Sequence, residues 1–297
     1  MGGVSQKEAA SYFKEMVMQQ RLTMGLIGEN ISRTRLPAAL EIMCAQHDLT
    51  LSFTPIDSKG DDGFDFDATV ARLIADGWDG VTVTHPFKLN AAKAAGNHAP
   101  QGAGGTRLAA SNLLKFSSPL IAYNTDYSGF IHMWRRLSDR APGHVAMSGA
   151  GGVASAIGPA LIQLGAESIT IWDVDNVRAN ELARSLGPTA QAIRIAEAEA
   201  ACASSDGLIN ATSLGMAGYG GTAFEPHWLT HASWAFDAVY TPNMTPFLTA
   251  AKSAGLTCLC GFSLFQSMAI ETFTTYTGLP VDGDDIIGKL EALRPED

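Results

Sequence analysis

The chain has 297 residues, which is enough for two domains, and a formal net charge of −10 at pH 7 without any cluster of lysines and arginines. Because nucleic acids and anionic membranes attract basic surfaces, we expect neither as a partner. No apolar run approaches the roughly 20 residues that span a bilayer, and Met1–Gln20 lack the apolar core of a signal peptide. The four cysteines are scattered, so we expect a reduced, cytoplasmic protein without a disulfide framework or a zinc site.

The first part of the chain alternates predicted helices and strands. Ser5 and Glu8 form a capping box, which predicts a helix near the N-terminus. Hydrophobic periodicity then predicts short buried strands at Thr23–Ile27, Leu49–Pro55, Gly80–Thr84 and Leu120–Tyr123, and helices at Leu36–Gln46 and Phe66–Asp76. Such alternation favours an α/β fold with a mainly parallel sheet.

The alternation begins again near residue 123. The predicted strands are His144–Ser148, Ser168–Trp172, Gly207–Asn210, Trp234–Ala238 and Thr257–Cys260, and the predicted helices are Tyr127–Leu137, Ala154–Leu164, Val177–Leu186, Thr245–Ala254, Ser263–Tyr276 and Asp284–Leu293. This is the layout of a dinucleotide-binding sheet. We therefore predict two α/β domains, a Rossmann-type domain at 123–262 and a domain made of residues 1–122 and 263–297, to which the last helices return.

A glycine-rich turn joins the strand that ends at Ser148 to the helix that begins at Ala154. Glycines there let the backbone turn tightly and approach a pyrophosphate, and the helix N-terminus presents free N–H groups to the negative charge. A surface turn can have the same composition, so the position between strand and helix is what favours a cofactor. The predicted dinucleotide site consists of Gly149, Ala150, Gly151, Gly152 and Val153.

An acidic residue at the end of the next strand bears on the choice of cofactor. Asp173 follows Ala154 by about 20 residues, the position from which an acid accepts a hydrogen bond from a ribose hydroxyl. Since a carboxylate repels a 2′-phosphate, we expect NAD to be preferred over NADP. Asp175 could share or take over this role, and Asp173 could instead cap the following helix. Arg178 could lie beside the adenine ribose or be a solvated helix residue.

Three other stretches place polar residues at the ends of predicted strands. They are Gly80–Lys88, Asn124–Gly129 and Asn210–Gly215. Together with the glycine turn, in the same order and at similar spacing, they resemble the shikimate/quinate dehydrogenase family over about Gly25 to Gly278, nearly the whole chain. The resemblance implies an N-terminal substrate-binding domain, an NAD-binding Rossmann domain, and reversible oxidation of a secondary alcohol on a hydroxylated cyclic carboxylate.

The resemblance also implies roles for individual residues. Alcohol oxidation requires a hydride acceptor and a group that takes the hydroxyl proton. By resemblance Lys88 is that acid/base and Asp126 is its partner; taken alone, the first could be a solvated lysine and the second a helix N-cap. Other residues that match the family motifs are Thr84 and Asn112 for the substrate, Tyr240 near nicotinamide and substrate, and Thr212 and Ser213 beside the cofactor.

The loop after the first strand departs from the family pattern. The family binds the substrate carboxylate with two hydroxyls in a Ser-x-Ser-Pro segment. Counting back from Pro37, Thr34 matches the first serine and Leu36 replaces the second. A shifted register would use Ser32 and Thr34 instead, and the sequence leaves both registers open.

Two further substrate positions are altered. Thr82 stands where the family usually has an asparagine, and Met268 occupies the position of a glutamine that holds ring hydroxyls. Gln266 could serve only in a shifted register, because two residues rotate a helix position by about 200°. Since a site built for hydroxyls discriminates strongly against their absence, these replacements predict a less polar or differently shaped substrate.

Three hypotheses remain open. The chain is an NAD-dependent dehydrogenase of the shikimate or quinate type, or it performs the same hydride transfer on a less polar alcohol, or it is a non-catalytic NAD-binding regulator. Lys88 and Asp126 argue against the third, because a regulator has no need of the pair.

We assign His85 to the structure or the pocket wall, and the other histidines have no metal-ligand spacing, so we expect no metal. A small-molecule substrate is the expected partner, and a homodimer is one option.

Overall fold

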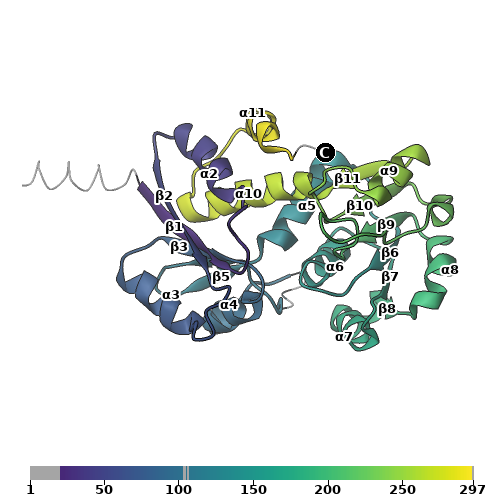
Figure 1. The fold of residues 1–297 in the computed structure, drawn as a ribbon, viewed down its shortest axis with the longest axis horizontal. Helices are drawn as coiled ribbons and strands as arrows, with labels where there is room; N and C mark the ends of the chain where they lie inside the picture. The colour runs from purple at the N-terminus through teal and green to yellow at the C-terminus, as the bar shows by residue number, and fades with distance from the viewer. Residues whose placement is uncertain (1–20, 103–104, 106, 296–297) are drawn as a thin grey trace, which may run out of the picture.

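The computed structural model describes residues 21–102, 105 and 107–295. The helix expected after Ser5 lies outside the described residues. Within the described range the chain forms two separate sheets, which lie at opposite ends of the long axis of the molecule (Figure 1). No helix in this part of the chain is long and apolar enough to cross a membrane.

The first sheet is built from residues that precede Asn124. Its strands are β1 (Arg21–Gly28), β2 (Thr50–Asp57), β3 (Gly80–Val83), β4 (Leu113–Lys115) and β5 (Ile121–Tyr123). They lie in the order β2-β1-β3-β4-β5, with β1 parallel to β2 and β3, and with β4 antiparallel to β3 and β5. The prediction omitted β4, because three residues are too few to show a periodicity.

Helices cover both faces of the first sheet. They are α2 (Leu36–Ala45), α3 (Phe66–Ala75), α4 (Lys88–Ala94), α10 (Gly261–Thr277) and α11 (Gly283–Leu290). Helices α2, α10 and α11 share one core with Leu113, whereas α3 and α4 share another with Leu114. These neighbouring leucines are both fully buried, as expected for a strand that is covered on both faces. The C-terminal helices therefore pack against the first sheet.

The second sheet is parallel throughout. Its strands are β6 (His144–Ser148), β7 (Ser168–Trp172), β8 (Ala190–Ala192), β9 (Gly207–Asn210), β10 (Trp234–Asp237) and β11 (Thr257–Cys260). The order β11-β10-β9-β6-β7-β8 starts in the middle, runs outward on one side and then on the other, as in a Rossmann fold. The predicted α/β architecture is confirmed, and the direction in which successive strands are added to the sheet reverses between β6 and β9.

The second sheet is also covered on both faces. Helices α5 (Thr125–Leu137), α6 (Ala154–Gln163) and α7 (Asn176–Leu186) form one layer, and α8 (Ala198–Cys202) and α9 (Pro246–Ser253) belong to the other. Short 3₁₀ turns are η1 (Gly96–His98), η3 (Gly187–Thr189), η4 (Ile195–Glu197), η5 (Pro226–Leu229) and η6 (Glu291–Leu293). The domain boundaries at 122–123 and 262–263 stay a prediction.

The two halves of the molecule meet where α5 packs against α10 (Figure 1). Gly129 of α5 permits the close approach, because a Cβ there would lie 3.0 Å from Cγ of Met268 and 3.1 Å from its backbone N. An ion pair joins the same two helices, with 2.6 Å between Nδ1 of His132 and Oε1 of Glu271. These contacts determine which side chains of α10 face the space between the sheets.

Candidate active site

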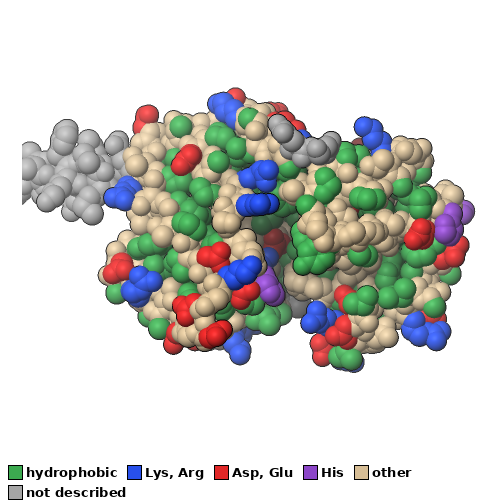
Figure 2. Space-filling model, viewed as in Figure 1, with side chains coloured by type: hydrophobic (Ala, Val, Ile, Leu, Met, Phe, Trp, Pro, Cys, Tyr) green, Lys and Arg blue, Asp and Glu red, His purple; other side chains and the backbone are tan. Residues whose placement is uncertain are grey.

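A cavity of about 770 Å³ lies between the two sheets. Figure 2 shows the corresponding hollow at the middle of the molecule. The lining residues come from the carboxyl ends of β1 and β3, from the segments that follow β6, β9 and β10, and from α10. Because α/β sheets bind ligands outside the carboxyl ends of their strands, this cavity is the candidate active site.

Lys88 reaches the cavity from the first residue of α4. The turn after β3 positions it, since the backbone N of Phe87 donates to the Thr84 carbonyl over 2.9 Å. The Phe87 ring packs against Phe64 and Phe66, with centroid distances of 5.1 and 5.5 Å. This aromatic anchor fixes the backbone, and the Lys88 side chain is 19% exposed.

Asp126 lies in the first turn of α5, next to Lys88. Nζ of Lys88 donates to Oδ2 of Asp126 over 2.5 Å, and the Asp126 side chain is only 5% exposed. Asn124, not Asp126, is the N-cap of α5, because its Oδ1 accepts from the backbone N of Asp126 and of Tyr127. The structure thus brings together the two residues that were expected to share the proton step.

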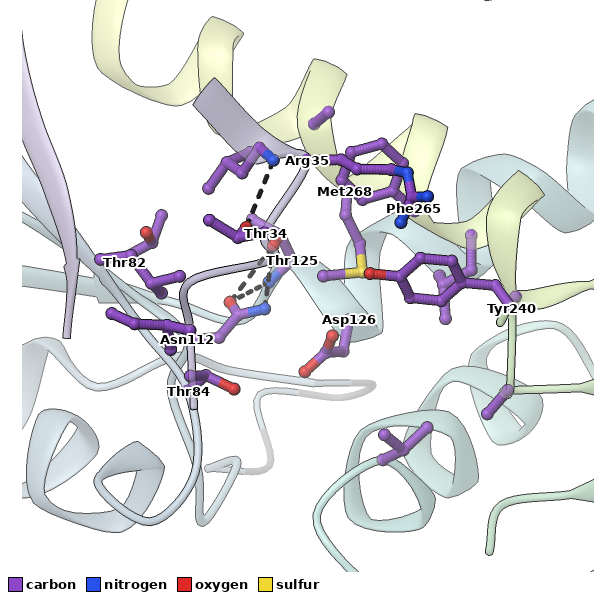
Figure 3. A pocket seen from close by; sticks show the side chains of 18 of the residues that line it. Thr34, Arg35, Thr82, Thr84, Asn112, Thr125, Asp126, Tyr240, Phe265 and Met268 are labelled. Atoms are coloured by element: carbon purple, nitrogen blue, oxygen red, sulfur yellow. Dashed lines mark hydrogen bonds between the residues drawn. The ribbon is translucent and has the colours of Figure 1, made fainter. Parts of the chain in front are cut away.

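Four polar residues from the first sheet and the start of α5 form one wall of the cavity: Thr82, Thr84, Asn112 and Thr125 (Figure 3). Oγ1 of Thr82 donates to the Gly25 carbonyl over 2.8 Å. Oδ1 of Asn112 accepts from the backbone N of Thr125 over 2.7 Å, and its Nδ2 donates to Oγ1 of the same residue over 3.0 Å. An amide nitrogen carries two hydrogens, so Asn112 keeps one for a ligand.

The opposite wall is largely apolar. The Tyr240 ring stacks on Phe265 with a centroid distance of 6.0 Å, and Met268 lies beside them (Figure 3). Burial raises the pKa of Tyr240 and the charge of Arg35 partly opposes this, so the phenol stays protonated at neutral pH. Gln266 points away from the cavity, because its Nε2 donates to Oε2 of Glu291 over 3.1 Å. Of the two α10 positions, only Met268 faces the candidate site.

The loop after β1 brings Thr34 and Leu36 to the cavity but not Ser32, which is exposed and absent from the lining. Oγ1 of Thr34 accepts from the backbone N of Leu36 over 3.3 Å. Arg33 and Arg35 also line the cavity, and the sequence analysis missed both. Since an arginine beside a turn is usually a solvated side chain, the sequence does not indicate that these two arginines line a cavity.

The three glycines in the turn after β6 carry no side chain that could shield its backbone from a ligand. Gly149 has φ 103°, and a Cβ there would lie 2.7 Å from the Ala211 carbonyl, so only glycine fits. A Cβ at Gly151 or Gly152 would meet no atom within 4 Å. Val153, the N-cap of α6, makes no side-chain capping bond, so the first N–H groups of the helix have no such partner. This arrangement fits the approach of a pyrophosphate.

Asp173 lies directly against the glycine turn. Its Oδ2 accepts from the backbone N of Ala150 over 2.7 Å, and its Oδ1 accepts from the backbone N of Asp175 over 2.8 Å. Asp175 is the N-cap of α7, because its Oδ1 accepts from the backbone N of Val177 over 2.9 Å. Asp175 also pairs with the exposed Arg178 over 3.4 Å. Asp173 is therefore not the helix cap, and its position suits a ribose.

Asp237, which the sequence analysis missed, anchors the segments that follow β9 and β10. Its carboxylate is fully buried and accepts from Oγ1 of Thr245 over 2.6 Å, Nδ2 of Asn210 over 2.9 Å and the backbone N of Val239 over 2.9 Å. Burial raises the pKa of Asp237 to about 6 despite these donors. Asn210 lies 27 residues away in the sequence, so no local motif could have revealed the whole network.

The loop after β9 reaches the cavity with other residues than those predicted. Oγ1 of Thr212 donates to Oδ1 of Asn210 over 2.7 Å, and Ser213 is exposed. Neither lines the cavity, whereas Met216 and Ala217 of the same loop do. Thr212 nevertheless borders the glycine turn, since a Cβ at Gly149 would lie 3.0 Å from its Cγ2.

Of the two roles considered for His85, a structural one and a place in the pocket wall, the second does not hold. It is exposed and is not among the residues that line the cavity, because the turn that directs Lys88 inward leaves His85 on the outside. In the described part of the chain no three histidine, cysteine, aspartate or glutamate side chains are grouped so that they could hold a metal ion.

Comparison with known proteins decides the family. No family model matches the chain. The NAD(+) quinate/shikimate dehydrogenase of Corynebacterium glutamicum strain R is 30% identical to it over 275 residues, which cover 89% of this chain and 96% of that protein. The chain belongs to the quinate/shikimate dehydrogenase family. The resemblance carried by the four motifs is confirmed.

Other members of the quinate/shikimate dehydrogenase family support this placement. An NADP(+) shikimate dehydrogenase from Mesorhizobium japonicum is 33% identical over 258 residues, which cover 85% of this chain and 89% of that protein. The solved quinate dehydrogenase from Corynebacterium glutamicum in complex with NAD matches with a TM-score of 0.83 at 27% identity, and the match covers 92% of this chain and 99% of that one.

Proposed function

We propose that the chain catalyses reversible hydride transfer between NAD and a secondary alcohol of a hydroxylated cyclic carboxylate of the shikimate or quinate type. The observation that carries this proposal is the pair of Lys88 and Asp126, 2.5 Å apart in the cavity between the two sheets. The NAD(+) quinate/shikimate dehydrogenase relative and the match to a quinate dehydrogenase in complex with NAD support the choice of reaction and cofactor.

The proton step uses Lys88, which follows the first sheet, and Asp126, which lies in the first turn of α5. Oxidation of the alcohol breaks the O–H bond and the C–H bond of one carbinol group, and NAD, when bound, accepts the hydride from carbon. Lys88 first releases one ammonium proton to solvent, and the neutral Nζ then accepts the hydroxyl proton. The carboxylate of Asp126 accepts the hydrogen bond from Nζ, which orients the lysine and stabilises the ammonium ion that forms.

The cofactor site uses the second sheet. In the turn formed by Gly149, Ala150, Gly151, Gly152 and Val153, the backbone N–H groups of the last three would hold the pyrophosphate. The N–H groups of Gly149 and Ala150 shape the turn by donating to the Trp172 carbonyl and to Asp173, and Thr212 and Ser213 would flank the cofactor. Asp173 would accept from the ribose hydroxyls and repel a 2′-phosphate. Asp175 and Arg178 pair with each other at the start of α7, so their contribution to the ribose site is secondary.

A second candidate keeps the hydride transfer but changes the substrate to a less polar alcohol. Leu36 and Met268 line the cavity where the family has a hydroxyl and an amide, and this observation favours it. Relative kcat/KM values for shikimate, quinate and ring carboxylates with fewer hydroxyls would separate the two candidates. A homodimeric assembly and a cytoplasmic location stay predictions.

Substitution of Lys88 tests the proposed function. We expect Lys88→Ala to lower turnover by about 10²- to 10⁴-fold, the range for loss of a general acid/base, with NADH affinity unchanged in a fluorescence titration. Lys93→Ala is the matched control, since Lys93 belongs to the same helix but is exposed and does not line the cavity. Unchanged turnover in the Lys88 variant would rule out the assigned role.

A further inference from the structure

Arg35 is a cation of the cavity wall that has no acidic partner. It occupies the N-cap position of α2, is half-buried, and makes no capping bond with its side chain. Among the described residues its guanidinium forms no hydrogen bond or ion pair. Figure 3 shows Arg35 on the side of the cavity where Phe265 and Tyr240 lie, and its charge acts on the Tyr240 phenol. A partly desolvated charge without a counter-charge is costly, which indicates that an anion completes this site.

The charges of the cavity also favour an anion. Among the described residues that line it, Arg33, Arg35 and Lys88 are cationic and Glu29 and Asp126 are acidic, three against two. Lys88 and Asp126 neutralise each other across 2.5 Å, and Arg33 is exposed. Of the remaining described lining residues, Arg35 and the acid Glu29 are both half-buried and form no ion pair with each other, so the charge of Arg35 has no direct counter-charge.

The neighbouring residues explain why an arginine is needed here. Leu36 offers no hydroxyl to a carboxylate, and Thr34 offers a single O–H donor, since its oxygen accepts from the backbone N of Leu36 and its hydrogen stays free among the described residues. A guanidinium presents several N–H donors in a rigid fork that matches the two oxygens of a carboxylate. One arginine can therefore supply more donors than the hydroxyl that Leu36 lacks.

We propose that Arg35 binds the carboxylate of the substrate. This inference rests on the proposed function, because it names the group that orients the ring toward Lys88 and Asp126. A ring held by its carboxylate at Arg35 contacts Leu36, Phe265 and Met268, which offer it no hydrogen bonds. The substrate class is a cyclic hydroxy acid whose hydroxyls face the wall of Thr82 and Asn112 and whose edge toward α10 is apolar.

Binding of simple ring acids tests the assignment without the need for turnover. Cyclohexanecarboxylate and its neutral amide would be titrated by calorimetry into the NADH-saturated enzyme. We expect the acid to bind the wild type more tightly than the amide, and Arg35→Gln to weaken acid binding by about 10- to 100-fold, which corresponds to loss of a charged hydrogen bond. Arg35→Lys, which keeps the charge without the fork, should restore part of the affinity.

Arg33→Gln is the matched control, because Arg33 also lines the cavity but is exposed. It should change acid binding by less than about threefold, as expected for a screened surface charge. Equal losses in the Arg33 and Arg35 variants would overturn the assignment, and so would a wild type that binds acid and amide alike. A loss of NADH affinity in Arg35→Gln with acid binding retained would assign Arg35 to the cofactor instead. Because Arg35 has no partner, the variant should unfold at the wild-type temperature.

Steady-state kinetics distinguish the proposed function from the proposed role of Arg35. If Arg35 binds the carboxylate, Arg35→Gln raises KM for the hydroxy acid far more than it lowers kcat, and NADH affinity stays constant. If the ring acid requires Arg35 for binding but no alcohol yields NADH, the proposed function fails and the role of Arg35 stands. If NADH formation requires Lys88 while the affinity for the ring acid is unchanged in Arg35→Gln, the proposed function stands and the role of Arg35 fails.

Discussion

At the scale of single residues, Asp173 links cofactor choice to the glycine turn. Its Oδ2 accepts from the backbone N of Ala150, so the acid and the phosphate-binding turn hold each other in place. Asp175, two residues later, is the N-cap of α7, because its side chain accepts from the backbone N of Val177 and of Arg178. The two aspartates therefore make separable contributions, one to the cofactor and one to the helix.

Replacement of Asp173 by alanine should change cofactor choice. We expect NAD(H) affinity to fall by about tenfold or more, since a charged hydrogen-bond acceptor is lost. The ratio of NAD(H) affinity to NADP(H) affinity should decrease, because the alanine variant lacks the carboxylate that repels the 2′-phosphate. Dissociation constants for all four nicotinamide cofactors would measure both effects. Asp175→Ala is the control, which should lower helix stability by about 1 kcal/mol and leave the preference unchanged. A wild type that already prefers NADP(H) would contradict this interpretation.

The resemblance of four ordered motifs to a known family sufficed to find Lys88 and Asp126, whose residue types taken alone left other roles open. They did not suffice for Arg35 and Asp237. Arg35 resembles any solvated arginine until the fold places it in a cavity, and Asp237 becomes informative only beside Asn210 and Thr245. Sequence identifies residues whose local context is distinctive, whereas partners that are distant in the chain need the tertiary structure.

At the scale of elements, the packing of α5 on α10 decides the lining of the substrate side. Gly129 lets α10 lie close enough for Met268 to face the cavity. Gln266, rotated by about 200°, donates instead to the Ile287 carbonyl of α11. Sequence left this choice open because helical periodicity gives a face but not its orientation in the fold. Long periodic elements such as α10 were predicted well. The short β8 and α4 were not predicted, because three and seven residues are too few to show a clear periodicity.

The ion pair between His132 and Glu271 should make the α5–α10 contact depend on pH. The hydrogen bond to Glu271 raises the pKa of His132 above its usual 6.5, so the charged histidine stabilises the fold. This contribution is fully present below the unfolded-state pKa of about 6.5 and is lost as the pH rises through the higher folded-state pKa. The difference in unfolding free energy between wild type and His132→Gln should therefore shrink from pH about 5 to about 9.

Denaturant titrations at several pH values would measure that difference. Glu271→Gln should flatten the same dependence, since it removes the other partner of the pair. We expect a small effect because the His132 side chain is 54% exposed and its charge is screened by solvent. A constant difference across the pH range would show that the pair contributes nothing to folding.

At the scale of the whole molecule, two sheets present their carboxyl ends to one shared cavity. The glycine turn and Asp173 belong to one side, and Lys88 belongs to the other. Hydride transfer requires that cofactor and substrate meet and that water be excluded, which closure of the two halves would achieve. We expect the radius of gyration in solution scattering to decrease when NADH and a substrate acid are both bound. Equal compactness with and without ligands would contradict such a closure.

The most direct test of the proposed chemistry is the appearance of NADH when the wild-type protein receives NAD together with shikimate, quinate or ring carboxylates with fewer hydroxyls. We expect NADH to form with at least one of these hydroxy acids, and its formation to depend on Lys88. Formation only with the less hydroxylated acids would identify the apolar wall around Met268 as the determinant of specificity. Failure to form NADH from any cyclic alcohol, with NAD binding demonstrated separately, would contradict the assignment of this chain as a dehydrogenase.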